Sequence, residues 1–136
     1  MPVVDRRSVL AFIVTGVPSL SVPWGAEAYS PESGQEVAPG VREVHLGSAS
    51  VSLPGYKLVG MRDLVFQAGS NTYDPSLPND MICHITQGLL RLKLGDWEWV
   101  AKRDIGLWAA TKGGRASYRN TGADVAIVRI MDLLSF

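Results

Sequence analysis

The sequence predicts an all-β domain, a sandwich or a barrel. From Val41 onward, short apolar segments are separated by Gly, Pro, Asn and Asp at about ten-residue intervals, which is typical of such folds. No window keeps a helical period. The chain has 136 residues, of which 13 are basic and 13 acidic. It therefore has the size of one domain and lacks the basic excess of a nucleic-acid-binding protein.

Eight strands are expected within a domain that covers 41–136. In chain order they are 42–46, 57–66, 80–86, 89–94, 97–101, 106–110, 115–119 and 125–132. Leu90, Leu92 and Leu94 alternate with basic residues, and a second alternating run follows Gly95-Asp96. Two residues beginning with Gly between such runs predict a tight hairpin, because Gly accepts a positive φ at the first turn position.

The first 28 residues are expected to be an export signal rather than part of the fold. Arg6-Arg7 precedes an uncharged run over 8–22, and Ala26-x-Ala28 offers small residues to a peptidase. The run is too short to span a bilayer. The arginine pair resembles a twin-arginine signal, which implies a periplasmic protein with no membrane span after signal removal. The alternative is an apolar N-terminal strand or helix packed on the core.

Residues 29–40 are expected to form a flexible linker, because Ser, Pro, Glu and Gly dominate them. Cys83 is the one cysteine of the sequence, so no disulfide can form within the chain. Stability must then come from the core.

The second half of the chain resembles a small single-domain cupin of the RmlC-like type. The resemblance rests on Gly69, a polar loop, a strand ending at Gly88, the Gly95-Asp96 hairpin, and then Gly113 and Asn120. It spans about 63–133 and implies a cupin-like double-stranded β-helix, or jelly-roll barrel.

At the metal-ligand positions of the family's two motifs, this sequence has residues of other types. Met81 stands where the family has its Glu ligand, and Ala116 stands at a His position. The loop over 73–79 contains no histidine. Since three imidazoles and a carboxylate hold the family's metal, we expect no metal cofactor here.

Met81 and Cys83 are expected on one face of their strand, pointing into the barrel, with His84 on the other. A thioether and a thiol could suit Cu(I) if a third soft ligand, such as Met61 or Met131, approached. Ordinary core packing is the favoured interpretation.

An alternative site would hold a transition metal (Cu, Zn or Fe) with Asp80, Cys83 and His84. Imidazole and carboxylate suit Zn or Fe together. His45, beside Glu43, is the second histidine and is expected to be a surface residue.

The aromatic residues either fill the barrel core or line an apolar pocket, since small-molecule sites are mostly apolar with a few polar groups, and those outside the core would also suit a dimer face. The expected lining combines them with the residues at the replaced positions: Met81, Cys83, Trp97, Trp99, Trp108, Ala116 and Tyr118. The leading hypothesis is a small-molecule-binding cupin without a metal. The runner-up is a metal-dependent cupin enzyme, an oxygenase or isomerase, with the rebuilt site. Open sheet edges also favour a homodimer.

Overall fold

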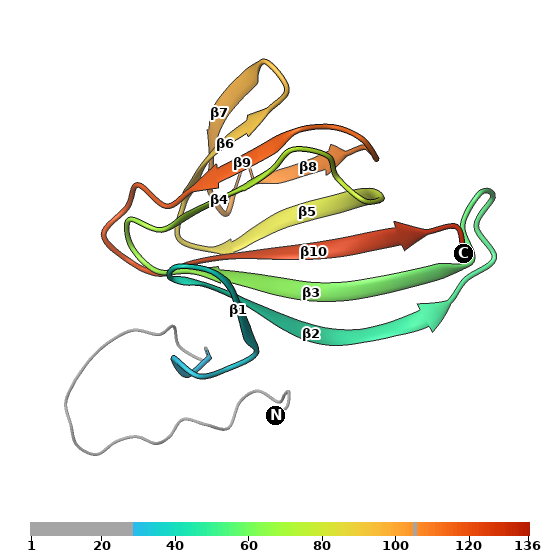
Figure 1. Cartoon of the computed structure of the whole chain (residues 1–136), viewed down its shortest axis with the longest axis horizontal. Helices are drawn as coiled ribbons and strands as arrows, with labels where there is room; N and C mark the ends of the chain where they lie inside the picture. Colours follow the sequence, from blue (N-terminus) through green and yellow to red (C-terminus); the bar gives the residue numbers. More distant parts are fainter. Residues whose placement is uncertain (1–28, 105) are drawn as a thin grey trace. The chain divides into compact units, whose positions relative to one another are not determined.

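The computed structural model describes residues 29–104 and 106–136, and these fold into ten antiparallel strands (Figure 1). The strands are β1 (Gln35–Ala38), β2 (Val41–Ser50), β3 (Leu58–Phe66), β4 (Asn71–Asp74), β5 (Asp80–Gln87), β6 (Leu90–Leu94), β7 (Trp97–Ala101), β8 (Leu107–Ala110), β9 (Ala116–Arg119) and β10 (Ala126–Leu134). No helix suited to crossing a bilayer occurs in these two ranges. The expected export signal, 1–28, lies outside the described residues.

The strands form two sheets, so the all-β prediction is confirmed. The larger has the order β1-β2-β3-β10-β5-β8, and the smaller has the order β4-β9-β6-β7. Figure 1 shows β10 between β3 and β5, strands that are far from it in sequence. Side chains of both sheets meet in one core, with Phe66 and Ile85 from the larger sheet and Leu92 and Tyr118 from the smaller.

Strand alternation decides which residues enter this core. On β5, Met81, Cys83 and Ile85 are buried, whereas Ile82 and His84 are exposed. This is the predicted division of faces, and it follows from the two-residue period of a strand. β10 pairs with both β3 and β5, and a bulge between Ile127 and Val128 interrupts its register with β5.

The hairpin expected at Gly95-Asp96 is confirmed. Leu94 pairs with Trp97 across a two-residue turn, and Lys93 pairs with Glu98 behind it. Gly95 has φ +59°, the left-handed conformation that favours glycine.

Two strands were not expected, and both are only four residues long. β1 lies inside the predicted linker 29–40, where Gln35 pairs with Glu43 of β2, so the linker assignment is corrected over Gln35–Ala38. β4 lies in a segment predicted to be loop, and Asn71 pairs there with Arg119 of β9. Both strands are largely exposed and are held by backbone hydrogen bonds, so their sequences carry no apolar alternation.

Candidate binding site

A cavity of about 180 Å³ lies between the two sheets. Strands from both sheets line it, together with the segment between β4 and β5. Its lining residues are Val37, Glu43, Arg62, Leu64, Thr72, Tyr73, Asp74, Leu77, Met81, Tyr118 and Ile130. It therefore contains Met81, the position that the cupin resemblance assigns to the replaced Glu ligand.

Arg62 and Glu43 line this cavity, and both belong to an ion-pair network with Asp132, which is not among the lining residues. The Nε and Nη2 of Arg62 donate to the two oxygens of Asp132 at 2.8 and 3.1 Å, and its Nη1 donates to Oε2 of Glu43 at 2.7 Å. The side chains of Arg62 and Glu43 are 19% exposed, and that of Asp132 is 15% exposed. Burial lowers the pKa of Arg62, but the hydrogen bonds and charges of Asp132 and Glu43 outweigh it, so the pKa is raised. The guanidinium therefore stays charged inside the fold.

Neighbouring residues fix this network in place. Asn79 Nδ2 donates to Oδ1 of Asp132 at 3.0 Å and to the backbone oxygen of Asp80 at 2.8 Å. The exposed His45 ring lies with Nε2 3.6 Å from Oε1 of Glu43. Asp132 thus has two partners, which limits the rotation of its carboxylate.

Of the predicted pocket residues, Met81 and Tyr118 line the cavity. Ala116 and Cys83 are buried in the core without lining it. Desolvation raises the pKa of Cys83 to about 12 and also raises the pKa of Tyr118. Both groups are therefore neutral at physiological pH, and Cys83 is not a thiolate.

The predicted tryptophans do not line this cavity. Trp97 is 74% exposed on β7, because β7 is the edge of the smaller sheet. Trp99 packs edge-to-face on Trp97 and on Trp108, with ring centroids 6.0 and 5.9 Å away. Trp108 Nε1 is buried and has no hydrogen-bond partner among the described residues. Trp99 and Trp108 pack against the core, which is the alternative that the sequence left open for them.

The alternative metal site is not assembled. Cys83 points into the core, whereas His84 is exposed on the opposite face of β5. Asp80 accepts hydrogen bonds from the Tyr56 hydroxyl at 2.5 Å and from the Lys112 N–H at 2.9 Å, which hold its pKa below the ordinary value. Within 29–104 and 106–136, no three His, Cys, Asp or Glu side chains are grouped as a metal would require.

The donor set at the family's metal positions does not fit the family's metal. Met81 offers one thioether and Ala116 offers no donor atom. Met61 and Met131 line a groove on the outer face of the larger sheet, so neither reaches Met81 as a third soft ligand.

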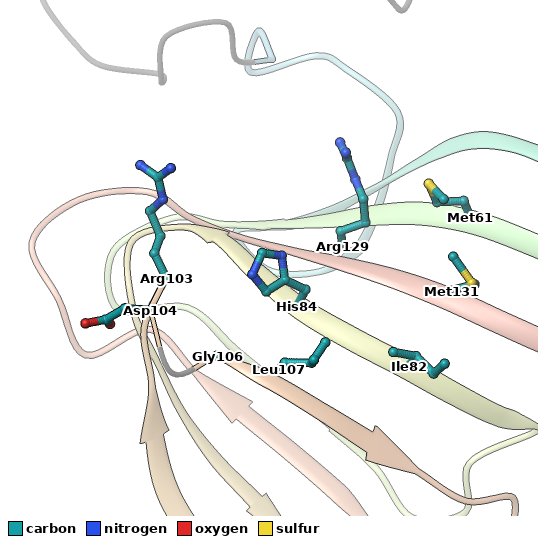
Figure 2. Close-up of a pocket in the computed structure, with 9 residues that line it drawn as sticks. All are labelled: Met61, Ile82, His84, Arg103, Asp104, Gly106, Leu107, Arg129 and Met131. Atoms are coloured by element: carbon teal, nitrogen blue, oxygen red, sulfur yellow. The ribbon is translucent and has the colours of Figure 1, made fainter.

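This outer groove is a further hollow, separate from the interior cavity. It has a volume of about 580 Å³ and is shown in Figure 2. His84 and Ile82 of β5, Leu107 of β8, and the methionines of β3 and β10 form its floor. Beneath it, Nε and Nη2 of Arg129 donate to the buried Asp63 carboxylate, each at 2.9 Å.

Sequence reasoning missed Arg62, Glu43 and Asp132 as site residues. A signal was present, since Arg62 has the same parity as Leu64 and Phe66 on β3, and these are buried. Asp132 likewise shares parity with the buried Ile130 of β10. A charge on the apolar face of a strand indicates a residue that points into the barrel.

No protein-family model matches the chain, and no curated protein matches it in sequence. Solved structures do match. The cupin domain of Schizosaccharomyces pombe Cnp3 is 18% identical with a TM-score of 0.58, covering 79% of this chain and 73% of that one. An RmlC-like cupin from Shewanella frigidimarina is 7% identical with a TM-score of 0.58, covering 78% and 87%. A predicted oxalate decarboxylase from Thermotoga maritima is 18% identical with a TM-score of 0.52, covering 69% and 81%. Sequence identities this low support a shared fold and give no information about activity. With its two antiparallel sheets around one core, the chain has the cupin jelly-roll fold.

Proposed function

We propose that this cupin-fold domain binds a small organic molecule in the interior cavity and uses no metal to do so. The observation that carries the proposal is the ion pair of Arg62 with Glu43 in the wall of a cavity whose other lining residues are mostly apolar, with Asp132 holding Arg62 from outside the lining. A few convergent polar groups in an apolar hollow are typical of small-molecule sites. Arg62 is held rigidly by its two partners, so the site is organised before a ligand arrives.

The charges favour a ligand that carries hydrogen-bond donors. Glu43 and Asp74 line the cavity beside Arg62, and Asp132 also pairs with Arg62, so acidic groups outnumber the basic one. Carboxylates accept hydrogen bonds and attract cations. The cavity is smaller than the roughly 300–1,000 Å³ of sites for drug-sized ligands. A small amine or polyol matches this combination.

A ligand screen tests the binding. We expect small amines or polyols, and not carboxylic acids, to raise the melting temperature of the full chain. The variant Glu43→Gln keeps the side-chain shape and should weaken binding of an amine about ten-fold, because it removes a charge from the cavity. Glu98→Gln, on the exposed β7, is the matched control. Equal affinities for the wild type and Glu43→Gln would contradict this assignment of the site.

Metal analysis tests the second half of the proposal. We expect purified protein to lose all transition metal on dialysis, because Met81 and Ala116 replace ligands. A stoichiometric metal that survives dialysis would reject the metal-free function.

We further propose that the protein acts in the periplasm after twin-arginine export. Arg6-Arg7 and the uncharged run over 8–22 support this. The intact mass of protein from the periplasmic fraction should correspond to cleavage after Ala28. Uncleaved protein confined to the cytoplasm would contradict export.

A further inference from the structure

β8 is an unusual edge strand. The two sheets end at β1, β4, β7 and β8. The other three edges each carry an acidic residue, namely Glu36, Asp74 and Glu98, whereas β8 reads Leu-Trp-Ala-Ala. Edge strands usually carry charge, proline or bulges that prevent pairing with another chain. Among the described edges, β8 alone lacks any charged or polar side chain that would discourage such pairing.

The backbone of β8 has an open row of hydrogen-bonding groups. Trp108 pairs with Cys83, and the N–H of Ile85 donates to the carbonyl of Gly106 at 2.9 Å. Antiparallel pairs alternate between bonded and non-bonded positions. Gly106 and Trp108 therefore bond toward β5, and Leu107 and Ala109 direct their N–H and C=O groups to the open side.

We propose that two copies of this chain pair antiparallel through β8, with a two-fold axis at Trp108. Directly opposite residues of an antiparallel pair lie on the same face of a sheet. Leu107 and Ala109 both face outward, as Ile82 does on β5. In this register, Leu107 lies opposite the partner's Ala109, and the relation is repeated by symmetry. Both residues use their open N–H and C=O groups, which gives four backbone hydrogen bonds and one continuous sheet.

The same register brings opposite charges together. Asp104 lies in the turn before β8, and Lys112 lies in the turn after it, and both are exposed. The pairing is antiparallel and centred on Trp108, so the turn before β8, which carries Asp104, lies beside the partner's turn after β8, which carries Lys112. The two-fold axis makes this contact twice.

Apolar surface beside β8 agrees with a second copy. Leu107 is 70% exposed and Ile82 is 41% exposed, and both line the outer groove (Figure 2). Pairing through β8 places Leu107 beside the partner's Ala109. The interface thus covers the largest exposed side chain of β8.

Proline substitution tests the backbone pairing. Full-length protein should sediment as a dimer. Ala109→Pro removes an N–H that points to the open side, so the monomer should fold, as shown by circular dichroism. It removes two of the four hydrogen bonds, and dimer affinity should fall about ten-fold or more. Ala109→Ser retains the N–H and should leave the dimer intact. A monomeric wild type, or a dimer unaffected by Ala109→Pro, overturns the proposal.

Mixing charge variants tests the two-fold register. Asp104→Lys alone and Lys112→Asp alone each place like charges together twice, so each variant should dimerise several-fold more weakly. In the mixed dimer both contacts are again oppositely charged. An equimolar mixture should therefore form a heterodimer tighter than either homodimer. Glu98→Lys, the same charge change on the β7 edge, should leave dimerisation unchanged. A mixture no tighter than the single variants, or equal weakening by Glu98→Lys, overturns this register.

Discussion

Arg62 is the residue on which the candidate site depends. Its neighbours on the inward side of β3 are apolar, and a guanidinium among them is tolerated because Asp132 and Glu43 supply three hydrogen bonds. Buried charges persist only when they are paired and hydrogen-bonded. Two of these groups, Arg62 and Glu43, line the cavity, so stability and the proposed binding rest on one network.

Removal of Arg62 should be costly. Arg62→Met leaves two carboxylates without their counter-charge, and we expect a loss of about 2–4 kcal/mol in the free energy of unfolding by urea. Adding Glu43→Gln and Asp132→Asn to that variant should recover most of the loss. Arg91→Met is the control, because the Arg91–Glu98 pair is 3.6 Å long and half-exposed. A loss no greater than that of Arg91→Met would show that the network does not stabilise the fold.

Cys83 should make the protein sensitive to alkaline pH. Burial raises its pKa from 9.0 to about 12, so the folded state keeps a proton that the unfolded state loses above pH 9. The stability from this thiol is complete below pH 9 and is lost as the pH rises toward 12. Cys83→Ala lacks this dependence, so its stability deficit against the wild type should shrink by about 1 kcal/mol between pH 7 and pH 10. Urea titrations at both pH values measure the deficit, and a constant deficit would contradict the raised pKa.

The face of a strand on which a residue lies could be predicted from the sequence, whereas side-chain contacts between distant strands could not. Alternation placed Met81 and Cys83 on one face and His84 on the other, and the cupin resemblance assigned the first face to the interior. The contact of Arg62 with Asp132 joins strands 70 residues apart. It depends on β3 and β10 being neighbours, which no local pattern reveals. Trp97 was considered for the pocket because it is a large aromatic residue, and strand alternation does not indicate that β7 is an edge.

At the level of elements, the apolar pattern of the sequence predicted the core strands but not the edge strands β1 and β4. The eight strands with apolar faces were predicted, because burial leaves a period of two in the sequence. β1 and β4 are stabilised by backbone pairing to β2 and β9, and their side chains are largely exposed. The sequence of such a strand resembles that of a loop, and only backbone pairing with an adjacent strand makes it a strand.

Gly88 and Gly95 both have a positive φ, but only at Gly88 would a side chain also clash with neighbouring backbone. At Gly88, with φ +73°, an added Cβ would lie 2.6 Å from the Val125 oxygen and 2.9 Å from the Ala126 Cα. At Gly95, with φ +59°, it would meet nothing within 4 Å. Gly95→Ala should cost about 1–2 kcal/mol from backbone strain alone. Gly88→Ala must also displace backbone before β10, so we expect more than about 3 kcal/mol by urea unfolding. Similar losses for the two variants would refute this difference.

For the whole molecule, the cupin fold was predicted from glycine spacing and strand pattern, and the matches to solved cupins confirm it. The chemistry could not be carried over with the fold, since Met81 and Ala116 stand at the replaced positions. Site residues in this fold come from strands of both sheets, and their identity depends on the register of each pairing.

Stability of the molecule should be independent of the redox state of the medium. Cys83 is the one cysteine of the chain and is fully buried. Urea midpoints measured with and without dithiothreitol should therefore agree, because no disulfide contributes. A midpoint that falls in dithiothreitol would reveal a disulfide between copies.

The position of β10 has a consequence for the order of folding. β10 follows the nine other described strands in the chain, yet it lies between β3 and β5 and pairs with both. The larger sheet therefore cannot close while the ribosome still holds this segment, and contacts this distant in sequence form slowly. Twin-arginine transport carries folded proteins, so the proposed export route would have to wait until synthesis has passed β10. Emergence of β10 from the ribosome would then set the earliest moment at which this domain can be exported in its folded form.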